Sequence, residues 1–319
     1  MAVKRSSPVR FAALAAMSMF PLFGHGYGHA AALDTSALLS DVRTLASPAF
    51  AGRLTGSDGN RLAQDYIKRR YTEIGITPFG ATYAMPFAIT ATGTTTPSAT
   101  NLIGYLRGSA HPERYMVVSA HFDHLGVHDG RIYPGADDNA SGVAAMLAIA
   151  AHFKAHPPQN TIVFAAFDAE EGGQHGAAHF VKSAPFPIAR VALNLNLDMV
   201  SRNDRNEIFA AGTRYTPSLK ALVVKGAATS SVKVRFGHDS RLPGAPPDDD
   251  WTTQSDHHEF YKLQIPFLYF GVEDHADYHQ PGDTFEKIDP AFFSEVVRML
   301  VNTAGILDHN LAAVKAEVK

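Results

Sequence analysis

The sequence predicts an α/β fold with a mixed, mostly parallel central sheet and helices on both faces of that sheet. The first observation is three short apolar runs of strand type, at Tyr115–Ala120, Thr161–Phe167 and Val191–Leu197. The second is that helical stretches at Gly142–Phe153 and Gly173–Ser183 separate these runs. Buried strands that alternate with helices are typical of parallel sheets, because the connecting helices cover both faces. The pattern therefore predicts a three-layer α/β/α architecture.

The segments on either side of this core extend the predicted fold. Residues 34–80 are predicted to be helical, with Gly75 ending the pattern. In Ala84–Arg107, Thr, Gly and Pro separate short β-type runs, which predicts an antiparallel hairpin, and Pro266–Phe270 is predicted to be a further strand. No linker rich in Pro, Gly or Ser divides the chain, so residues 33–319 are predicted to form a single domain. The helical spacing rests on Leu62, Tyr66, Ile67, Tyr71 and Ile74, and near the C-terminus on Phe292, Phe293, Val296, Val297, Leu300 and Val301 of a long amphipathic helix.

Composition excludes several classes of protein. Of the 319 residues, 45% are hydrophobic and 18% are charged, which is ordinary for a soluble globular protein. The formal net charge is -3 and there is no basic run, so a nucleic-acid partner is not expected. The chain has no cysteine, which excludes disulfides and thiolate nucleophiles. Any bound zinc must therefore be held by His, Asp and Glu.

The first 32 residues have the layout of a secretory signal peptide. Three basic residues precede the apolar stretch Phe11–Phe23, and a small-residue end follows at Ala30–Ala32. The apolar stretch is too short to span a bilayer as a mature helix. We expect an exported protein, periplasmic or secreted, with residues 1–32 removed and no membrane attachment afterwards.

Acidic and histidine side chains gather directly after the predicted strands. The segment His121–His124 follows the first strand, and alternate side chains of an extended segment point the same way. Asp123 could then accept the second ring N–H of His121 and fix its tautomer, as is common at metal sites. Asp137 and Asp138 stand at the head of the next helix. Helix capping accounts for one acid there, but a carboxylate could also bridge two metal ions, since each oxygen can face a different ion.

Further acidic and histidine residues follow the later strands. Glu170 and Glu171 lie at the end of the most hydrophobic strand, where one could be a metal ligand and the other a general base. Asp198 ends a strand among large apolar residues, a costly position unless the carboxylate is paired or coordinates a cation. His279 follows the last strand, and the segment Ser255–His257 precedes it.

These clusters are expected to converge, because open α/β sheets bind ligands at the carboxyl ends of their strands. Two histidines and three acids without thiolates suit a catalytic zinc or manganese site, and five ligands with one bridging carboxylate suffice for a two-metal hydrolase. A serine hydrolase is disfavoured, because no Gly-x-Ser-x-Gly sequence occurs. The zinc motif His-Glu-x-x-His is also absent, since Lys262 follows where its second His is needed.

Taken together, the motifs resemble metallopeptidase family 28, the co-catalytic zinc aminopeptidases and their relatives. The resemblance covers about residues 34–310 and implies the three-layer fold of the zinc exopeptidases. It is carried by Ser119–His124, Gly135–Gly142, Ala169–Gly172, Asn196–Met199, Ser255–His257 and Tyr278–Thr284, with Leu45–Pro48 and Gly52–Gly56 upstream.

The resemblance implies two Zn²⁺ per chain and indicates which residues bind each ion. His121 and Asp198 would hold one ion, Glu171 and His279 would hold the other, and Asp138 would bridge them.

The same resemblance implies the catalytic residues. Glu170 would be the general base, Asp123 would be the partner of the His121 ring, and Tyr278 would steady the tetrahedral intermediate. A cis peptide is also implied between Asp138 and Asn139.

The implied function is an aminopeptidase that hydrolyses peptides with a free N-terminus through a metal-bridged hydroxide. Glutaminyl cyclisation and carboxypeptidase activity are alternatives on the same fold, and a peptidase-like binding module is the non-enzyme alternative. The irregular segment Gly237–Ser255, which contains the only tryptophan, Trp251, is expected to wall the pocket for the substrate side chain. Nothing in the sequence indicates the oligomeric state.

Overall fold

The structure is a computed structural model and describes residues 33–91, 94–240 and 249–314. The signal peptide expected over residues 1–32 lies outside the described residues, as do residues 241–248 of the expected irregular segment. No helix within the described ranges combines the length and the apolar character that a bilayer crossing requires.

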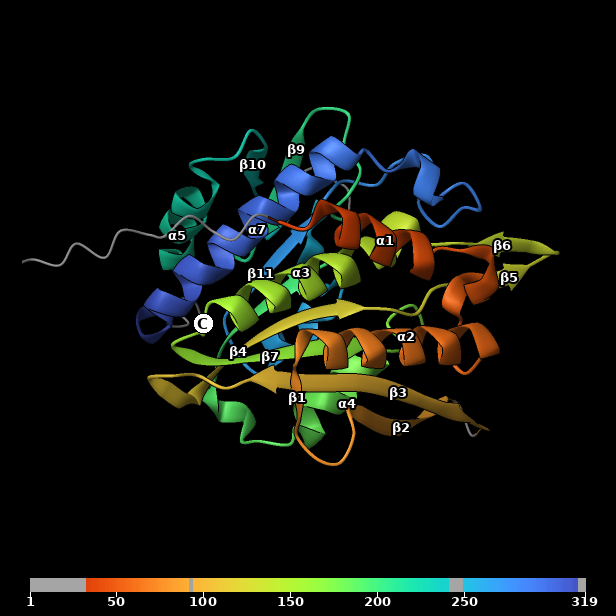
Figure 1. Cartoon of the computed structure of the whole chain (residues 1–319), viewed down its shortest axis with the longest axis horizontal. Coiled ribbons are helices and arrows are strands. Elements are labelled where there is room, and N and C mark those ends of the chain that lie inside the picture. The colour runs from red at the N-terminus through yellow and green to blue at the C-terminus, as the bar shows by residue number, and fades with distance from the viewer. Residues whose placement is uncertain (1–32, 92–93, 241–248, 315–319) are drawn as a thin grey trace, which may run out of the picture. The chain divides into compact units, whose positions relative to one another are not determined.

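A nine-stranded mixed sheet forms the centre of the described chain, in the order β1-β3-β7-β4-β8-β11-β9-β10, with β2 paired to β3 (Figure 1). The four middle strands β7, β4, β8 and β11 are parallel to one another. Strand β3 is antiparallel to β7, and β9 is antiparallel to β11. The strands are β1 (Thr77–Pro78), β2 (Ala84–Ala91), β3 (Thr94–Leu106), β4 (His111–His121), β7 (Asn160–Phe167), β8 (Val191–Leu197), β9 (Glu207–Ala211), β10 (Lys233–Phe236) and β11 (Phe267–Gly271).

Helices cover both faces of this sheet and complete the three layers. One face packs against α1, α2, α3, α5 and α7, and Figure 1 shows α1, α2, α3 and α7 on the viewer's side. The other face packs against α4 and α6. The helices are α1 (Thr35–Leu45), α2 (Asp58–Ile74), α3 (Gly142–Ala155), α4 (His175–Ser183), α5 (Ser218–Ala227), α6 (His257–Lys262) and α7 (Pro290–Asn310), and a small separate hairpin is formed by β5 (Gly126–His128) and β6 (Arg131–Tyr133).

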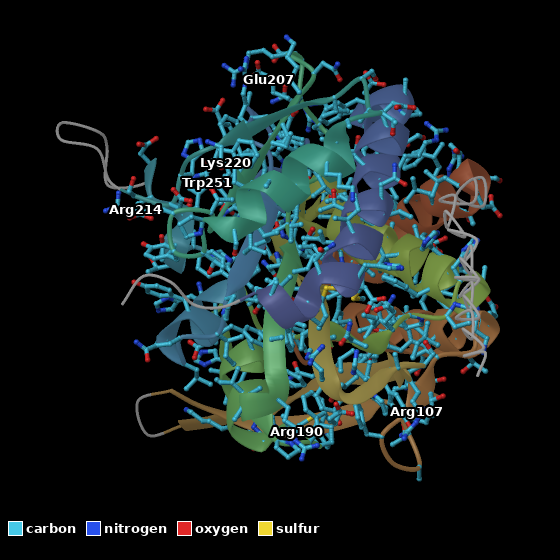
Figure 2. The ribbon with its side chains drawn as sticks, turned by 90° about the vertical axis from the view of Figure 1, so that its left-hand side faces the viewer. Arg107, Arg190, Glu207, Arg214, Lys220 and Trp251 are labelled. Atoms are coloured by element: carbon cyan, nitrogen blue, oxygen red, sulfur yellow. The ribbon has the colours of Figure 1, made fainter. Side chains whose placement is uncertain are left out.

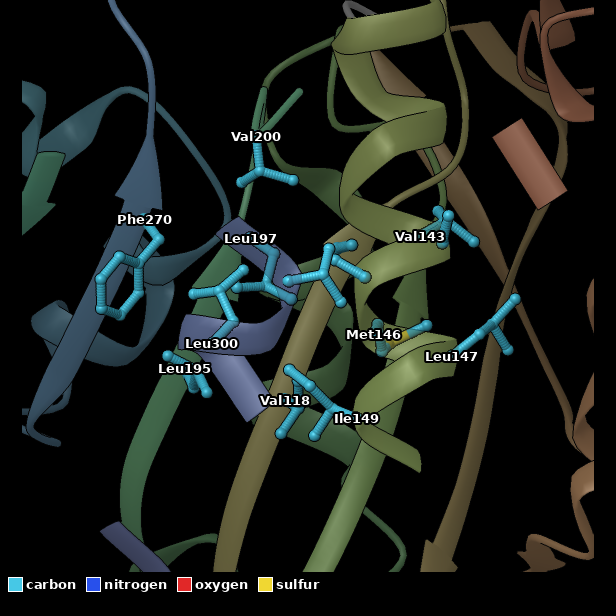
Figure 3. Close-up of a cluster of buried hydrophobic side chains, with 14 of the residues drawn as sticks. Val118, Val143, Met146, Leu147, Ile149, Leu195, Leu197, Val200, Phe270 and Leu300 are labelled. Carbon is cyan, nitrogen blue, oxygen red and sulfur yellow. The ribbon is translucent and has the colours of Figure 1, made fainter. Parts of the chain in front are cut away.

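The core follows from the alternation of side chains along the buried strands. In β4, Val118 points to the larger helical layer and Val117 to the α4 side. Figure 3 shows Val118 and Leu195 of the sheet packed with Ile149 of α3 and Leu300 of α7. Because both faces are buried, the central strands are largely apolar, although β8 also carries the buried Asn194 and Asn196, and this is why these strands could be predicted from the sequence.

The predicted three-layer fold, the antiparallel hairpin and the strand–helix alternation are confirmed. The helical region is not continuous, because a short turn of 3₁₀ helix at Pro48–Arg53 separates α1 from α2. Gly75 ends α2 with φ 82°, a left-handed conformation that glycine adopts without a steric penalty. Leu62, one of the residues that gave the helical spacing, is 46% exposed, and the buried face of α2 includes Ala63, Tyr66 and Ile67.

Candidate metal centre and active site

The predicted metal ligands lie at one end of the sheet. His121 is the last residue of β4, Asp198 directly follows β8, and Glu171 comes four residues after β7. Since β4, β7, β8 and β11 run parallel, their carboxyl ends bring these residues and His279, which follows β11, to the same place. Asp138 joins them from the turn before α3, and its peptide bond to Asn139 is cis, as expected.

The five side chains form two groups that share one carboxylate. His121 Nε2 lies 3.3 Å from Asp138 Oδ1 and 3.2 Å from Asp198 Oδ1. His279 Nε2 lies 3.1 Å from Asp138 Oδ2 and 3.2 Å from Glu171 Oε2. The two oxygens of Asp138 therefore face different groups, one on each side of the carboxylate.

These separations fit zinc. Two donors bound to one tetrahedral zinc at about 2.0–2.1 Å lie about 3.3 Å from each other. The four distances between His nitrogens and carboxylate oxygens, 3.1–3.3 Å, match that value on both sides of Asp138. The donor set of imidazole and carboxylate without thiolate is also the set that catalytic zinc uses. Three carboxylates held this close would repel one another unless cations lay between them.

His279 marks the side from which the centre is reached. Its side chain is 37% exposed, whereas the other four are 10% exposed or less. A cavity opens at this point, and Glu170 lies in its wall. The cavity is lined by His121, Asp138, Glu170, Asp198, Met199, Trp251, Gln254, Tyr269, Val272, Asp274, Tyr278 and His279.

The pKa shifts in the centre reflect competition between burial and charge. Burial alone lowers the pKa of His121, but the carboxylates of Asp198 and Glu170 outweigh it and raise that pKa well above its usual value. Burial raises the pKa of Glu170 well above the ordinary glutamate value, and the charges of Asp256 and Asp198 add to this effect. A glutamate with a raised pKa accepts a proton more readily than an exposed one, which suits a general base.

Asp123 lies beside His121, but its carboxylate contacts differ from those expected. His121 Nδ1 is 3.7 Å from Asp123 Oδ1, too far for a hydrogen bond, and 3.2 Å from the backbone oxygen of Asp123. The Asp123 carboxylate instead accepts from the backbone N–H of Glu170 at 3.0 Å, and the N–H of Glu171 is 3.4 Å away. Asp123 therefore connects the segment that bears the first ligand with the segment that bears the two glutamates.

Two aromatic side chains named from the sequence lie in the cavity wall. The ring of Tyr278 stacks on that of His279, with 3.9 Å between ring centroids. Burial raises the pKa of Tyr278, and the charges of Asp138 and Asp198 raise it further, so its hydroxyl keeps its proton. Trp251 stacks on His238 at 3.8 Å. Figure 2 shows Trp251 toward the β9–β10 edge of the sheet and Arg107 at the opposite edge.

Sequence reasoning missed residues that hold the ligand segments in place. Arg53 is fully buried and donates to the backbone oxygens of Leu45, Phe122, Pro134 and Gly135. Its only signal in the sequence was its place in the Gly52–Gly56 motif. Asp283 accepts from the backbone N–H groups of Asp137 and Asp138 at 3.0–3.1 Å, and it too was known only as a motif residue.

Asp256 was likewise known only as part of a motif. It is fully buried, and among the described residues neither of its carboxylate oxygens has a hydrogen-bond partner. Burial raises its pKa well above the aspartate value, against the attraction of His121.

Curated relatives of the chain include proteins named as peptidases, and each of them matches part of it. The Bacillus subtilis aminopeptidase YwaD is 30% identical over 206 residues, 61% of this chain and 41% of that protein. A probable zinc metalloprotease of Pyrenophora tritici-repentis is 31% identical over 157 residues, 45% of this chain and 34% of that protein. The chain therefore spans less than half the length of these relatives.

Solved structures with the same fold cover most of the chain. A Zn-dependent exopeptidase from Parabacteroides distasonis has a TM-score of 0.69 at 18% identity and covers 86% of this chain and 99% of its own. The zinc aminopeptidase BSAP of Bacillus subtilis has a TM-score of 0.68 at 16% identity, covering 90% and 97%. A glutaminyl cyclase from Porphyromonas gingivalis reaches 0.70 at 20% identity, covering 86% and 98%. At these identities the likeness establishes the fold.

The sequence itself establishes the family. The model of peptidase family M28 matches residues 101–304, which contain the five converging side chains and Glu170. The chain therefore belongs to peptidase family M28.

Proposed function

We propose that the chain is an exported, dizinc aminopeptidase. The observation that carries this proposal is the shared carboxylate: Asp138 presents one oxygen to the group of His121 and Asp198 and the other to the group of Glu171 and His279. With one zinc ion on each side of Asp138, His121 and Asp198 would hold one ion and Glu171 and His279 the other, so each ion would have three protein donors.

The chemistry divides between the metals and the protein. Zinc in these positions supplies Lewis acidity, which polarises a carbonyl group and makes water more acidic. Glu170, in the cavity wall, takes the proton from the attacking water and returns it to the departing amine. Asp123 holds the backbone of Glu170 by accepting its N–H. Tyr278 keeps its proton and can donate a hydrogen bond to the oxyanion that develops on the substrate.

The cavity supports a substrate with a free α-ammonium group. Asp198, Asp274 and Glu170 line it, so acidic side chains lie around the place where the N-terminus of a peptide would lie beside the metals. The apolar part of the lining comes from Met199, Trp251 and Val272 and gives a surface for the first side chain. A carboxypeptidase would need a cation to hold the terminal carboxylate, and no Arg or Lys is among the described residues that line the cavity.

The activity is tested with a mixed set of peptides with free and N-acetylated termini, incubated with the zinc-loaded protein and analysed by mass spectrometry. We expect stepwise loss of residues from free N-termini, with the acetylated peptides spared. Loss from C-termini would make the protein a carboxypeptidase. Loss of ammonia from N-terminal Gln would make it a glutaminyl cyclase. Zinc binding without any product would favour a peptidase-like binding module.

Export is a separate part of the proposal and rests on the signal-type sequence of residues 1–32. Expression of the full chain in a bacterium with a periplasm, followed by N-terminal sequencing, tests it. We expect the mature protein in the periplasm or medium, beginning near residue 33. An uncleaved N-terminus in the cytoplasmic fraction would contradict export without bearing on the peptidase activity.

A further inference from the structure

His124 lies in the metal centre without an assigned role. It is fully buried, and its Nδ1 is 2.5 Å from Glu171 Oε1 and 3.7 Å from Asp138 Oδ2. Its donor atom, with one oxygen each from Asp138 and Glu171, is close enough for all three to hold an ion together. His124 could therefore be either a sixth metal ligand or a residue that acts on Glu171.

The distances decide between these two roles. Two ligands of one tetrahedral zinc lie about 3.3 Å apart, because each bond is about 2.0–2.1 Å long. At 2.5 Å, His124 Nδ1 and Glu171 Oε1 are much closer than that and form a hydrogen bond, even shorter than the roughly 2.7–2.9 Å of an ordinary charge-assisted N–H···O bond. The other oxygen of the same carboxylate, Oε2, is 3.2 Å from His279 Nε2, which is a ligand–ligand separation.

Glu171 thus uses its two oxygens differently. Oε2 faces the metal position together with His279, and Oε1 accepts a hydrogen bond from His124. An ionised carboxylate only accepts hydrogen bonds, so the ring proton lies on Nδ1 of His124. Nε2 of that ring is buried and has no partner among the described residues, which is tolerable for a nitrogen that carries no proton.

The ring of His124 is also confined by its neighbour. A Cβ atom placed on Gly135 would lie 2.6 Å from both Cγ and Cδ2 of His124, closer than such atoms approach in proteins. Gly135 has φ +58°, which glycine adopts readily. The backbone therefore packs directly against the ring and holds Nδ1 toward Glu171.

We propose that His124 is a positioning residue that fixes Glu171 as a one-oxygen ligand and so sets the affinity of the metal position that Glu171 shares with His279. Without this hydrogen bond the carboxylate could rotate, and the ion would lose a pre-oriented donor. Hydrogen-bond partners of metal ligands typically change metal affinity about 10–100-fold. This inference rests on the proposed pair of metal positions.

Metal binding to the chelator-stripped protein tests the proposal without a peptide substrate. Zn²⁺ and Co²⁺ titrations compare the wild type with His124→Asn and His124→Leu. Asparagine places an amide N–H close to the position of Nδ1, whereas leucine cannot donate. We expect His124→Leu to weaken one of the two binding steps about 10–100-fold and leave the other unchanged. His124→Asn should stay within a few-fold of the wild type.

Two further measurements complete the test: metal affinity in a double variant with Glu171, and the absorption spectrum of the Co²⁺-loaded protein. In a Glu171→Gln background, His124→Leu should cause little further loss of affinity, because the partner is already changed. Wild-type affinity in His124→Leu would overturn the proposal. The proposal would also be overturned if both His124 variants weakened metal binding equally and altered the Co²⁺ absorption spectrum at full loading. That result would identify His124 as a direct metal ligand. A wild-type protein that binds one ion only would refute the dizinc proposal and this inference together, whereas two ions with no peptidase activity would refute only the proposed substrate.

Discussion

Arg53 donates from Nε to the backbone oxygen of Phe122 at 2.7 Å, although the two residues are 69 positions apart in the chain. Phe122 directly follows His121 of the metal centre. The same guanidinium reaches the backbone oxygen of Gly135 at 2.9 Å, and Gly135 stands three residues before Asp138. One buried cation thus joins the segments that carry two of the predicted ligands.

Replacement of Arg53 should destabilise the protein strongly. Burial lowers the pKa of Arg53 to about 10, against nearby carboxylates that raise it, so the side chain is charged at neutral pH. Arg53→Met would leave four backbone oxygens without their donor, and we expect the free energy of unfolding to fall by about 3–5 kcal/mol. Urea unfolding of the metal-free protein measures this.

Arg53→Lys keeps the charge but cannot reproduce the planar set of donors, so most of the loss should remain. Arg61→Met, at a largely exposed arginine, is the control and should change stability by less than about 0.5 kcal/mol. A loss below about 1 kcal/mol in Arg53→Met would contradict the role given to Arg53.

Glu170→Ala should keep zinc and lose turnover. Positioned general bases contribute about 10²–10⁴-fold to rate, so kcat should fall by that factor while metal content, measured by atomic emission, stays unchanged. Glu113→Gln, at an exposed glutamate in β4, provides the control. Equal activity in the Glu170 variant at matched zinc content would remove Glu170 from the mechanism.

The sequence was sufficient for the parts of the site that follow directly from strand ends. His121, Glu171 and Asp198 each come just after an apolar run, and a parallel sheet necessarily brings such ends together. The central strands were predictable from their burial on both faces, which leaves a largely apolar run in the sequence. The short strands β9 and β10 and the helix α5 carry weaker patterns and were not predicted.

The contacts of individual side chains could not be read from the sequence. Asp123 was expected to pair with the His121 ring because alternate residues of a strand share a face, but β4 ends at His121 and the alternation ends with it. The hydrogen bond from His124 to Glu171 joins residues 47 positions apart. The partners of Arg53 are backbone oxygens, which every residue has. No particular residue type in the sequence could therefore indicate what Arg53 binds.

Trp251→Ala should change substrate preference. The indole lines the cavity and stacks on His238, so its removal enlarges the cavity and takes away part of its apolar lining. We expect the kcat/KM ratio between peptides with N-terminal Leu and N-terminal Ala to change by about 10-fold or more, since one or two methylene contacts are worth about 1–3 kcal/mol. Unchanged ratios across the peptide set would exclude Trp251 from the pocket wall.

Since Trp251 is the only tryptophan, its fluorescence offers an independent reading. Binding of a free amino acid that inhibits the enzyme should shift its emission. An emission that stays constant at saturating inhibitor would place the bound side chain elsewhere.

His257 should make the protein sensitive to acid. The ring is fully buried, donates from Nε2 to the backbone oxygen of Trp251 at 2.9 Å, and burial lowers its pKa from 6.5 to about 3. Between these values the unfolded chain binds a proton and the folded chain does not, so stability must decrease as pH falls from about 6.5 to about 3. At pH 4.5 this costs up to about 2–3 kcal/mol relative to pH 7.

His257→Gln keeps an N–H for the Trp251 oxygen and removes the titration. Urea unfolding at pH 7 and pH 4.5, with chelator present, compares the two proteins. The carboxylates titrate in the wild type and in the variant alike. The difference between the pH dependences of the two stabilities therefore gives the contribution of His257. The variant should lose less stability on acidification than the wild type, whereas the control His309→Gln, at an exposed histidine, should behave as the wild type does. Equal losses of stability on acidification in all three proteins would contradict this role of His257. They would mean that the ring takes up its proton in the folded protein, through a local opening near Trp251.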